Sequence, residues 1–177
     1  MELFIELFIY NNSMTEIKTD RLVLRKPKAK EEILSICKQI GNWEVVKWLS
    51  QAPYPYTYKD CENFLIKNKD NEFSLNIFLG KKLIGGVGLI LDDDNYYELG
   101  YWLGKSYWGK GYATESSKYL LEYAVEKLIS PKIKSDHFIN NIASANVLKK
   151  LGFKEVGIEK IYSNSNKKEM DMMLLIL

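Results

Sequence analysis

The hydrophobic pattern changes from helical spacing to a period of two at Phe73, and this change restricts the fold more than any other feature. From Phe73 to Leu79 apolar and polar side chains largely alternate, which is typical of a β-strand. A turn at 80–82 sends the chain back along 83–91, where three glycines interrupt the run. A polar turn then leads to 96–103. We therefore expect an antiparallel meander of three strands.

Apolar residues at helical spacing lie on both sides of this meander, and Thr57 with Asp60 three residues later is typical of a helix N-terminus. The expected helices are 30–40, 43–49, a segment after Thr57, 113–128 and 142–151, and the expected further strands are 21–25, 132–138, 153–161 and 168–176. This order predicts an α+β fold with a largely antiparallel sheet.

The chain of 177 residues suits one domain. Its first residues form an apolar run that is too short to span a bilayer. Glu2 and Glu6 stand where a signal peptide would carry positive charge. We therefore expect 1–13 to be an N-terminal extension, either an edge strand or a tail, and 14–177 to be the domain.

Composition argues against several classes of function. Lys and Arg total 25 and Asp and Glu total 23, so the net charge of +2 does not favour nucleic-acid binding. His137 is the one histidine, which excludes a multi-histidine metal site. Cys37 and Cys61 cannot form a zinc cluster by themselves, and buried reduced thiols are expected. The sequence thus predicts a cytoplasmic protein that has no metal, no nucleic-acid partner and no membrane partner.

The segment 99–114 carries the clearest chemical motif. A strand leads into a loop with Gly109 and Gly111, and this loop opens a long helix. Glycines let a ligand approach the backbone, and the free N–H groups of a helix N-terminus attract anions. The loop is therefore a candidate cradle for a phosphate or pyrophosphate, or else an ordinary strand–helix turn. It matches neither the P-loop nor the dinucleotide-binding spacing.

A second motif lies at 140–153, where Asn141 and Ser144 are three residues apart. If a helix starts near Asn141, both residues face its N-terminal end. The alternative is that Asn141 merely caps the helix and Ser144 is a small packing residue.

Together the two segments resemble the GNAT superfamily of N-acetyltransferases, most closely its RimJ/RimL-like branch of ribosomal-protein N-terminal acetyltransferases. The resemblance runs from Thr19 to about Leu175 and includes 108–113, where Trp108 replaces the usual Gln or Arg, and the Asn-x-x-Ser helix ending in Lys-x-Leu-Gly-Phe. It implies a mixed, mostly antiparallel central sheet that is flanked by helices and contains a splayed central strand pair.

The resemblance further implies that acetyl-CoA binds as a co-substrate. Its pantetheine would lie between the strand ending at Leu103 and the strand 132–138, against backbone groups of Tyr101 and Leu103. Lys150 would approach the 3′-phosphate, or else remain a solvated lysine. The residues assigned to acetyl-CoA binding are Tyr101, Trp102, Leu103, Trp108, Gly109, Lys110, Gly111, Tyr112, Ala113, Thr114, Asn141 and Lys150.

For catalysis, an attacking amine must be neutral, so a base is needed. Glu98 is the candidate base, acting through water; its alternative is a structural or exposed carboxylate. A backbone N–H near Gly100 would stabilise the oxyanion.

Leu148 occupies the position where many family members have the tyrosine that serves the leaving thiolate. The resemblance therefore assigns the thiolate to Ser144, positioned by Asn141. Tyr107 and Tyr112 are weaker candidates for this role.

The function implied is transfer of acetyl from acetyl-CoA to a primary amine, by direct attack in a ternary complex. The acceptor is either a protein N-terminus or a small-molecule amine, and its wall would include aromatic residues unless these serve the core: Trp43, Trp48, Tyr54 and Tyr56. The alternatives are a non-catalytic acetyl-CoA-binding or sensing module and a plain structural protein. A homodimer is compatible with the family, although nothing in the sequence shows one.

Overall fold

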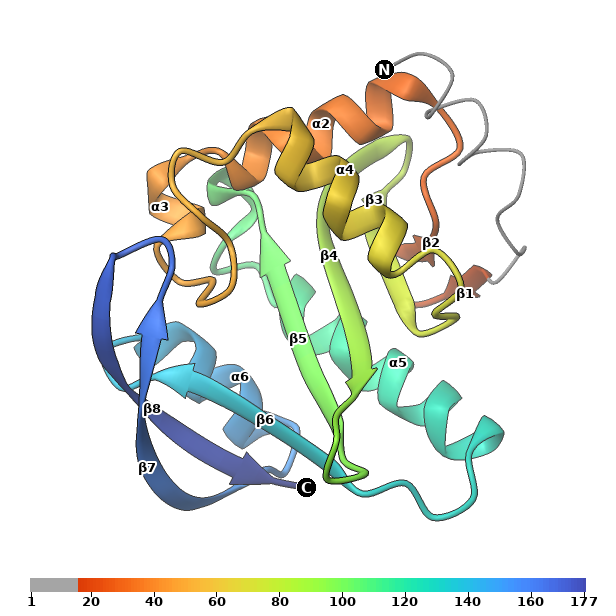
Figure 1. Cartoon of the computed structure of the whole chain (residues 1–177). Helices are drawn as coiled ribbons and strands as arrows, with labels where there is room; N and C mark the ends of the chain where they lie inside the picture. Colours follow the sequence, from red (N-terminus) through yellow and green to blue (C-terminus); the bar gives the residue numbers. More distant parts are fainter. Residues whose placement is uncertain (1–15) are drawn as a thin grey trace.

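The computed structural model describes residues 16–177, so the expected extension at 1–13 lies outside the described residues. Over this range one mixed sheet runs through the molecule in the order β1-β2-β3-β4-β5-β6-β8-β7 (Figure 1). Its strands are β1 (Glu16–Lys18), β2 (Val23–Arg25), β3 (Ser74–Leu79), β4 (Lys82–Leu91), β5 (Tyr97–Leu103), β6 (Ile133–Phe138), β7 (Lys154–Ser163) and β8 (Lys168–Ile176).

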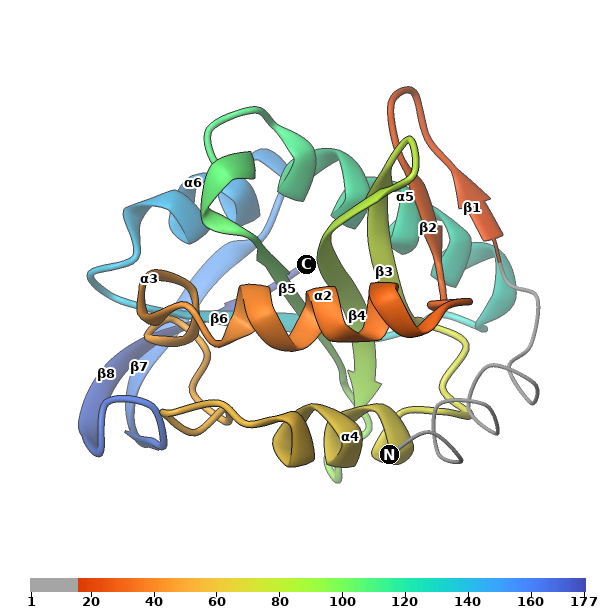
Figure 2. The same ribbon diagram turned by 90° about the horizontal axis from the view of Figure 1, so that it is seen from above.

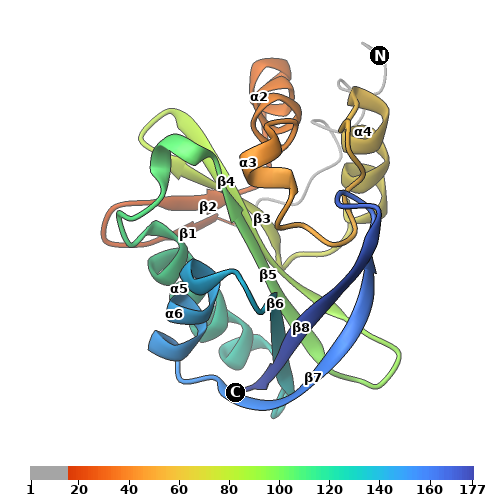
Figure 3. The ribbon, with the colours of Figure 1, turned by 90° about the vertical axis from the view of Figure 1, so that its left-hand side faces the viewer.

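Helices cover both faces of the sheet, as Figures 2 and 3 show. On one face lie α2 (Lys30–Ile40), α3 (Trp43–Val46) and α4 (Tyr58–Lys67). On the other face lie α5 (Tyr112–Lys127) and α6 (Ile142–Lys150), and a short 3₁₀ turn, η1 (Lys105–Tyr107), precedes α5. The expected α+β class is thus confirmed.

Each face of the sheet has its own hydrophobic core. Towards α5 and α6 the core includes Ile84, Val87, Leu99, Leu120, Ala124 and Leu148. Towards α2 and α4 it includes Ile33, Ile36, Ile40, Cys61, Leu65, Phe78 and Leu83. Because both faces are covered, the central strands are held rigidly, and a site placed between them is well positioned.

The expected meander is present, because β3, β4 and β5 pair antiparallel in sequence order. The expected splayed pair is also present. β5 and β6 run parallel but pair only over Tyr97–Leu99 and Ile133–Ser135. The carbonyl of Leu99 accepts a hydrogen bond from Ser135 Oγ at 2.8 Å, and beyond it the two strands diverge. The divergence leaves one edge of β5 unpaired.

Some expected boundaries were wrong. The strand expected at 21–25 starts only at Val23, because the Arg21 backbone N–H donates to Glu115 of α5 at 2.8 Å instead of joining the sheet. The helix expected at 43–49 ends at Val46. The N-terminus expected at Thr57 is confirmed: its hydroxyl and the Asp60 carboxylate form a capping box. No helix within 16–177 is long and apolar enough to cross a membrane.

Candidate active site

Two cavities open on the divergence of β5 and β6. The smaller, of about 300 Å³, is lined by the loop before α5 and by the first residues of α6. The larger, of about 450 Å³, is lined by α4, the loop 49–56 and the central strands. Both cavities are lined by Tyr101, Trp102 and Ser144. These three residues therefore mark the place where the contents of the two cavities would meet.

The smaller cavity is lined by all the residues that the sequence assigned to acetyl-CoA except Lys110. The Lys110 ammonium instead donates to the carbonyl of Ser106 at 2.9 Å. The cavity wall also includes Val45 and Trp48 of the α3 region, which were not assigned to acetyl-CoA.

The loop before α5 has the geometry of an anion site. Gly109 and Gly111 have φ of 73° and 81°, a region that disfavours side chains. Gly111 is the N-cap of α5, and no side chain caps the helix. The first-turn N–H groups of α5 therefore face the cavity without a side-chain acceptor, at the positive end of the helix dipole. The loop thus fits a pyrophosphate.

A partly exposed network of hydrogen bonds and an ion pair braces this loop. The Arg21 guanidinium forms an ion pair with Glu115 at 2.6 Å and donates to the carbonyl of Lys110 at 3.1 Å. The Thr19 hydroxyl donates to Glu115 at 2.6 Å. Partial burial acts to raise the pKa of Glu115, but the hydrogen bonds from Thr19 and Arg21 hold it below its usual value. The start of the domain is thereby tied to the anion-binding loop.

The unpaired edge of β5 presents its backbone to the cleft. Tyr97 N–H and Leu99 C=O point towards β6, so by alternation the groups of Tyr101 and Leu103 point the same way. The Leu103 carbonyl already accepts from the indole of Trp108 at 2.8 Å. Trp108 therefore has a structural role, and the Leu103 carbonyl is less free for a ligand than the sequence led us to expect.

Ser144 lies close to a hydroxyl that was not considered from the sequence. Its Oγ and the Tyr101 hydroxyl are 2.8 Å apart. Asn141 Oδ1 accepts from the backbone N–H of Ser144 at 3.2 Å, so Asn141 caps α6 and fixes the backbone of Ser144 rather than its hydroxyl. Burial raises the pKa of Tyr101 to about 12, and its phenol therefore stays protonated at neutral pH.

Three carboxyl groups line the larger cavity, Asp60 of α4, Glu98 of β5 and Asp136 of β6, and the last two come from the diverging strands. Burial raises the pKa of Glu98; Lys134 opposes this shift, and Asp92 and Glu159 add to it. Burial is the main cause that raises the pKa of Asp136 to about 7, and the negative charge of Glu98 is the next. Asp136 was missed because an acidic residue in a strand is ordinarily solvent-exposed, and only the divergence from β5 places it in the cavity.

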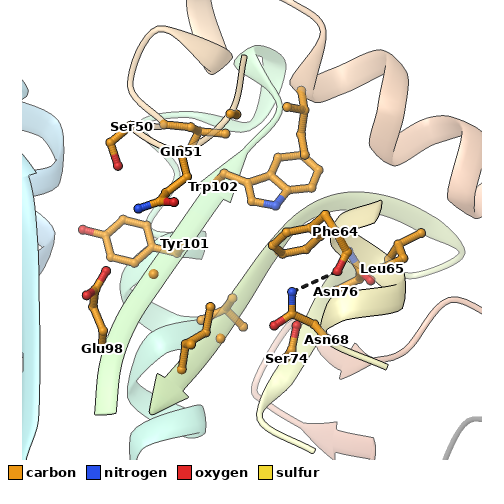
Figure 4. A pocket seen from close by; sticks show the side chains of 18 of the residues that line it. Ser50, Gln51, Phe64, Leu65, Asn68, Ser74, Asn76, Glu98, Tyr101 and Trp102 are labelled. Carbon is orange, nitrogen blue, oxygen red and sulfur yellow. Dashed lines mark hydrogen bonds between the residues drawn. The ribbon is translucent and has the colours of Figure 1, made fainter. Parts of the chain in front are cut away.

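Figure 4 shows the larger cavity, with Glu98, Tyr101 and Trp102 of β5 on one side and Phe64, Leu65 and Asn68 of α4 on the other. The expected aromatic wall is only partly present. Tyr56 lines this cavity and Trp48 the smaller one. Trp43 and Tyr54 line neither and pack edge to face on each other, with ring centroids 4.9 Å apart.

The other singled-out residues have structural positions. His137 is buried, its Nδ1 lies 2.9 Å from the Phe138 carbonyl, and it lines neither cavity. Leu148 is fully buried in the core. Cys37 and Cys61 are free thiols. Among the described residues, no three His, Cys, Asp or Glu side chains gather in a way that could hold a metal ion.

The site thus combines a splayed sheet, a glycine loop at an uncapped helix start and two cavities that share three lining residues. The profile of the family described as "Acetyltransferase (GNAT) domain" matches residues 21–154. The chain belongs to this GNAT family and is an acetyltransferase, and members of the family use acetyl-CoA. The uncharacterized N-acetyltransferase p20 of Bacillus licheniformis is 26% identical over 172 residues, which cover 93% of this chain and 96% of that protein.

Solved structures share the fold. The GNAT-family acetyltransferase from Bacillus anthracis has a TM-score of 0.78 and 23% identity, covering 92% of this chain and 98% of that one. RimL, the ribosomal L7/L12 α-N-protein acetyltransferase in complex with coenzyme A, has a TM-score of 0.75 and 18% identity over 92% of this chain and 98% of its own.

Proposed function

We propose that the chain transfers the acetyl group of acetyl-CoA to a primary amine, with both substrates bound at once. The observation that carries this proposal is the meeting of two cavities at Tyr101 and Ser144. The smaller cavity, with the uncapped start of α5, suits the anionic co-substrate. The larger one, with Glu98 and Asp136 on its wall, suits an amine that must lose a proton.

Glu98 and Asp136 supply the base. An alkyl amine is mostly protonated at neutral pH, so its ammonium is first attracted to the carboxylates and then loses a proton. Because burial and the charge of Glu98 raise the pKa of Asp136, and burial raises that of Glu98, the two carboxyl groups are suited to accept that proton directly or through water. Elevated pKa values bring the carboxyl groups closer to the pH at which they must work.

The neutral nitrogen attacks the thioester carbonyl carbon, a C–N bond forms and the C–S bond breaks. A backbone N–H near Gly100 and Tyr101, on the unpaired edge of β5, stabilises the developing oxyanion. The hydroxyls of Tyr101 and Ser144 hydrogen-bond the departing thiolate. Asn141 contributes by holding the start of α6, which carries Ser144.

We further propose that the chain belongs with the RimJ/RimL-like branch, whose acceptors are protein N-termini. The motifs at 108–113 and 141–153 and the likeness of fold to RimL support this placement. A small-molecule amine is the other acceptor class that the larger cavity accommodates.

The test is a CoA-release assay with amines and N-terminal peptides, beside calorimetry with acetyl-CoA. We expect acetyl-CoA to bind and at least one amine class to release CoA. Binding without release for every amine would favour the alternative, a non-catalytic acetyl-CoA-binding or sensing module. Absence of acetyl-CoA binding would overturn both.

A further inference from the structure

The larger cavity has charges of opposite sign on its walls. Glu98 and Asp136 line it beside the meeting point of the two cavities. Lys26, which follows β2, also lines it and is only 6% exposed. Asp60 is the remaining charged residue of the lining, and its carboxylate accepts from the backbone N–H of Thr57 at 2.8 Å. Lys26 is thus the cation of this cavity.

The Lys26 ammonium donates one hydrogen bond within the described part of the chain, although it has three N–H donors. Its Nζ donates to the carbonyl of Asn68, the C-cap of α4, at 2.8 Å. An ammonium has three N–H donors, so this bond fixes the side chain and leaves donor capacity towards the cavity. Burial lowers the pKa of Lys26 to about 8, with Asp70 opposing the shift, so the group remains mainly cationic at neutral pH. A buried cation of this kind is stabilised by an anion.

Between the two ends, two paired glycines leave room on the floor of the cavity. Gly88 of β4 and Gly100 of β5 face each other in register, and both line the cavity. A Cβ at Gly100 would meet nothing within 4 Å, and its backbone is not left-handed. The glycine is therefore not required by local packing, and it leaves room for a ligand to lie across the strands.

From this arrangement we propose that Lys26 binds the carboxylate of an elongated acceptor whose amine lies at Glu98 and Asp136. This inference rests on the proposed function, because it names the acceptor class for the same cavity. Arg25, next to Lys26, lies in register with Trp102 through β3 and β4, four residues along β5 from Glu98. The spacing across the sheet and the offset along it together place the backbones of Lys26 and Glu98 about 17 Å apart. An α-amino acid, with both groups on one carbon, is too short; an ω-amino acid or a short peptide with a free carboxylate fits.

The test compares 6-aminohexanoate with 6-aminohexanamide, which differ only in the charge at the far end, and with glycine as the short acceptor. In the unmodified protein we expect kcat/KM to be about 10-fold or more higher for the carboxylate than for the amide. Lys26→Met, which keeps the aliphatic chain, brings this ratio close to one. The matched control Lys59→Met, at an exposed lysine paired with Glu62, leaves the ratio unchanged.

The ratio does not depend on how much of the variant is folded, so loss of stability cannot imitate the effect. Equal rates for the two probes, preference for glycine, or an unchanged ratio in Lys26→Met would overturn this inference. Turnover of the amide would in that case leave the proposed acetyl transfer standing. If acetyl-CoA binds but neither these probes nor any other amine or peptide of the CoA-release assay releases CoA, both proposals are wrong.

Discussion

Tyr101 and Ser144 come from β5 and α6, and the Tyr101 hydroxyl contacts both the hydroxyl and the carbonyl of Ser144 where the two cavities meet. The sequence motif pointed to Ser144, with Tyr107 and Tyr112 as weaker candidates, since Leu148 occupies the usual tyrosine position. Tyr101 supplies a phenol from another element. The phenol keeps its proton well above neutral pH, because its pKa is about 12, so it acts as a hydrogen-bond donor.

Ser144→Ala is expected to lower kcat about 10- to 100-fold and to change acetyl-CoA affinity much less, since a hydrogen bond to a charged group contributes roughly 1.5–3 kcal/mol. Tyr101→Phe should act in the same direction. The double variant should lose less than the product of the two effects, because both residues serve one thiolate. Steady-state kinetics with calorimetry measure this. A normal kcat in Ser144→Ala would remove Ser144 from the mechanism.

Asp136 should give kcat/KM a dependence on pH. A base must be unprotonated to work, so kcat/KM should rise with pH through about 7, the pKa of Asp136, and fall below it. In Asp136→Asn this step should disappear and activity at pH 8 should drop about 10-fold or more. The matched control Asp93→Asn, in the exposed turn before β5, should keep the step. If kcat/KM of Asp136→Asn still rose fully through pH 7, the titrating base would be a group other than Asp136.

At the scale of elements, the proposed pyrophosphate site depends on the start of α5 and the loop before it. The backbone holds two left-handed glycines, and the Arg21–Glu115 ion pair ties the loop to the first residues of the domain. The positive φ angles explain why glycines stand at these two positions, and this relation is local in the sequence. The brace joins residues 94 positions apart, and only the fold brings them together.

Gly111→Asp is expected to abolish acetyl-CoA binding, with affinity at least about 100-fold weaker. The added carboxylate would stand at the anion site, and a left-handed φ strains any side chain there. Gly80→Asp is the matched control, because Gly80 also has positive φ, 58°, but lies in the β3–β4 turn. Isothermal titration calorimetry of both variants measures their affinity for acetyl-CoA. Unchanged affinity in Gly111→Asp would show that the pyrophosphate binds elsewhere.

At the scale of the whole molecule, the sheet formed by residues 16–177 is one continuous layer, and in this range its one parallel junction lies between β5 and β6. The divergence there opens a passage from the α5–α6 side to the α2–α4 side. The two hydrophobic cores hold the sheet from both faces, so the packing of the fold keeps the β5–β6 opening in place.

A ligand that bridges this junction should stabilise the whole domain. At a concentration 100 times its Kd, acetyl-CoA should add about 2.7 kcal/mol to the free energy of unfolding. For a domain of this size that corresponds to a rise in Tm of about 5–10 °C. Differential scanning calorimetry measures the shift, with dephospho-CoA to test the contribution of Lys150. No rise with acetyl-CoA would contradict binding to the folded state.

Local patterns predicted most of the architecture. Period-two alternation indicated the meander, and Thr57 and Asp60 indicated the start of α4. The splayed pair was implied by the resemblance to the GNAT superfamily. The errors have one physical cause. Arg21 left the expected strand for Glu115, and Asp136 entered the cavity, because contacts distant in sequence outweighed local propensity.

The sequence by itself determined the order of elements, the glycine loop that suits an anion and the residues that surround it. Its hydrophobic periods and glycine positions are local, and each acts within a few residues. Only the tertiary structure decided that Tyr101 meets Ser144, that Glu98 and Asp136 share a cavity, and that Lys26 stands at its other end. These relations depend on how strands diverge and helices pack, since burial and charge act between neighbours in space.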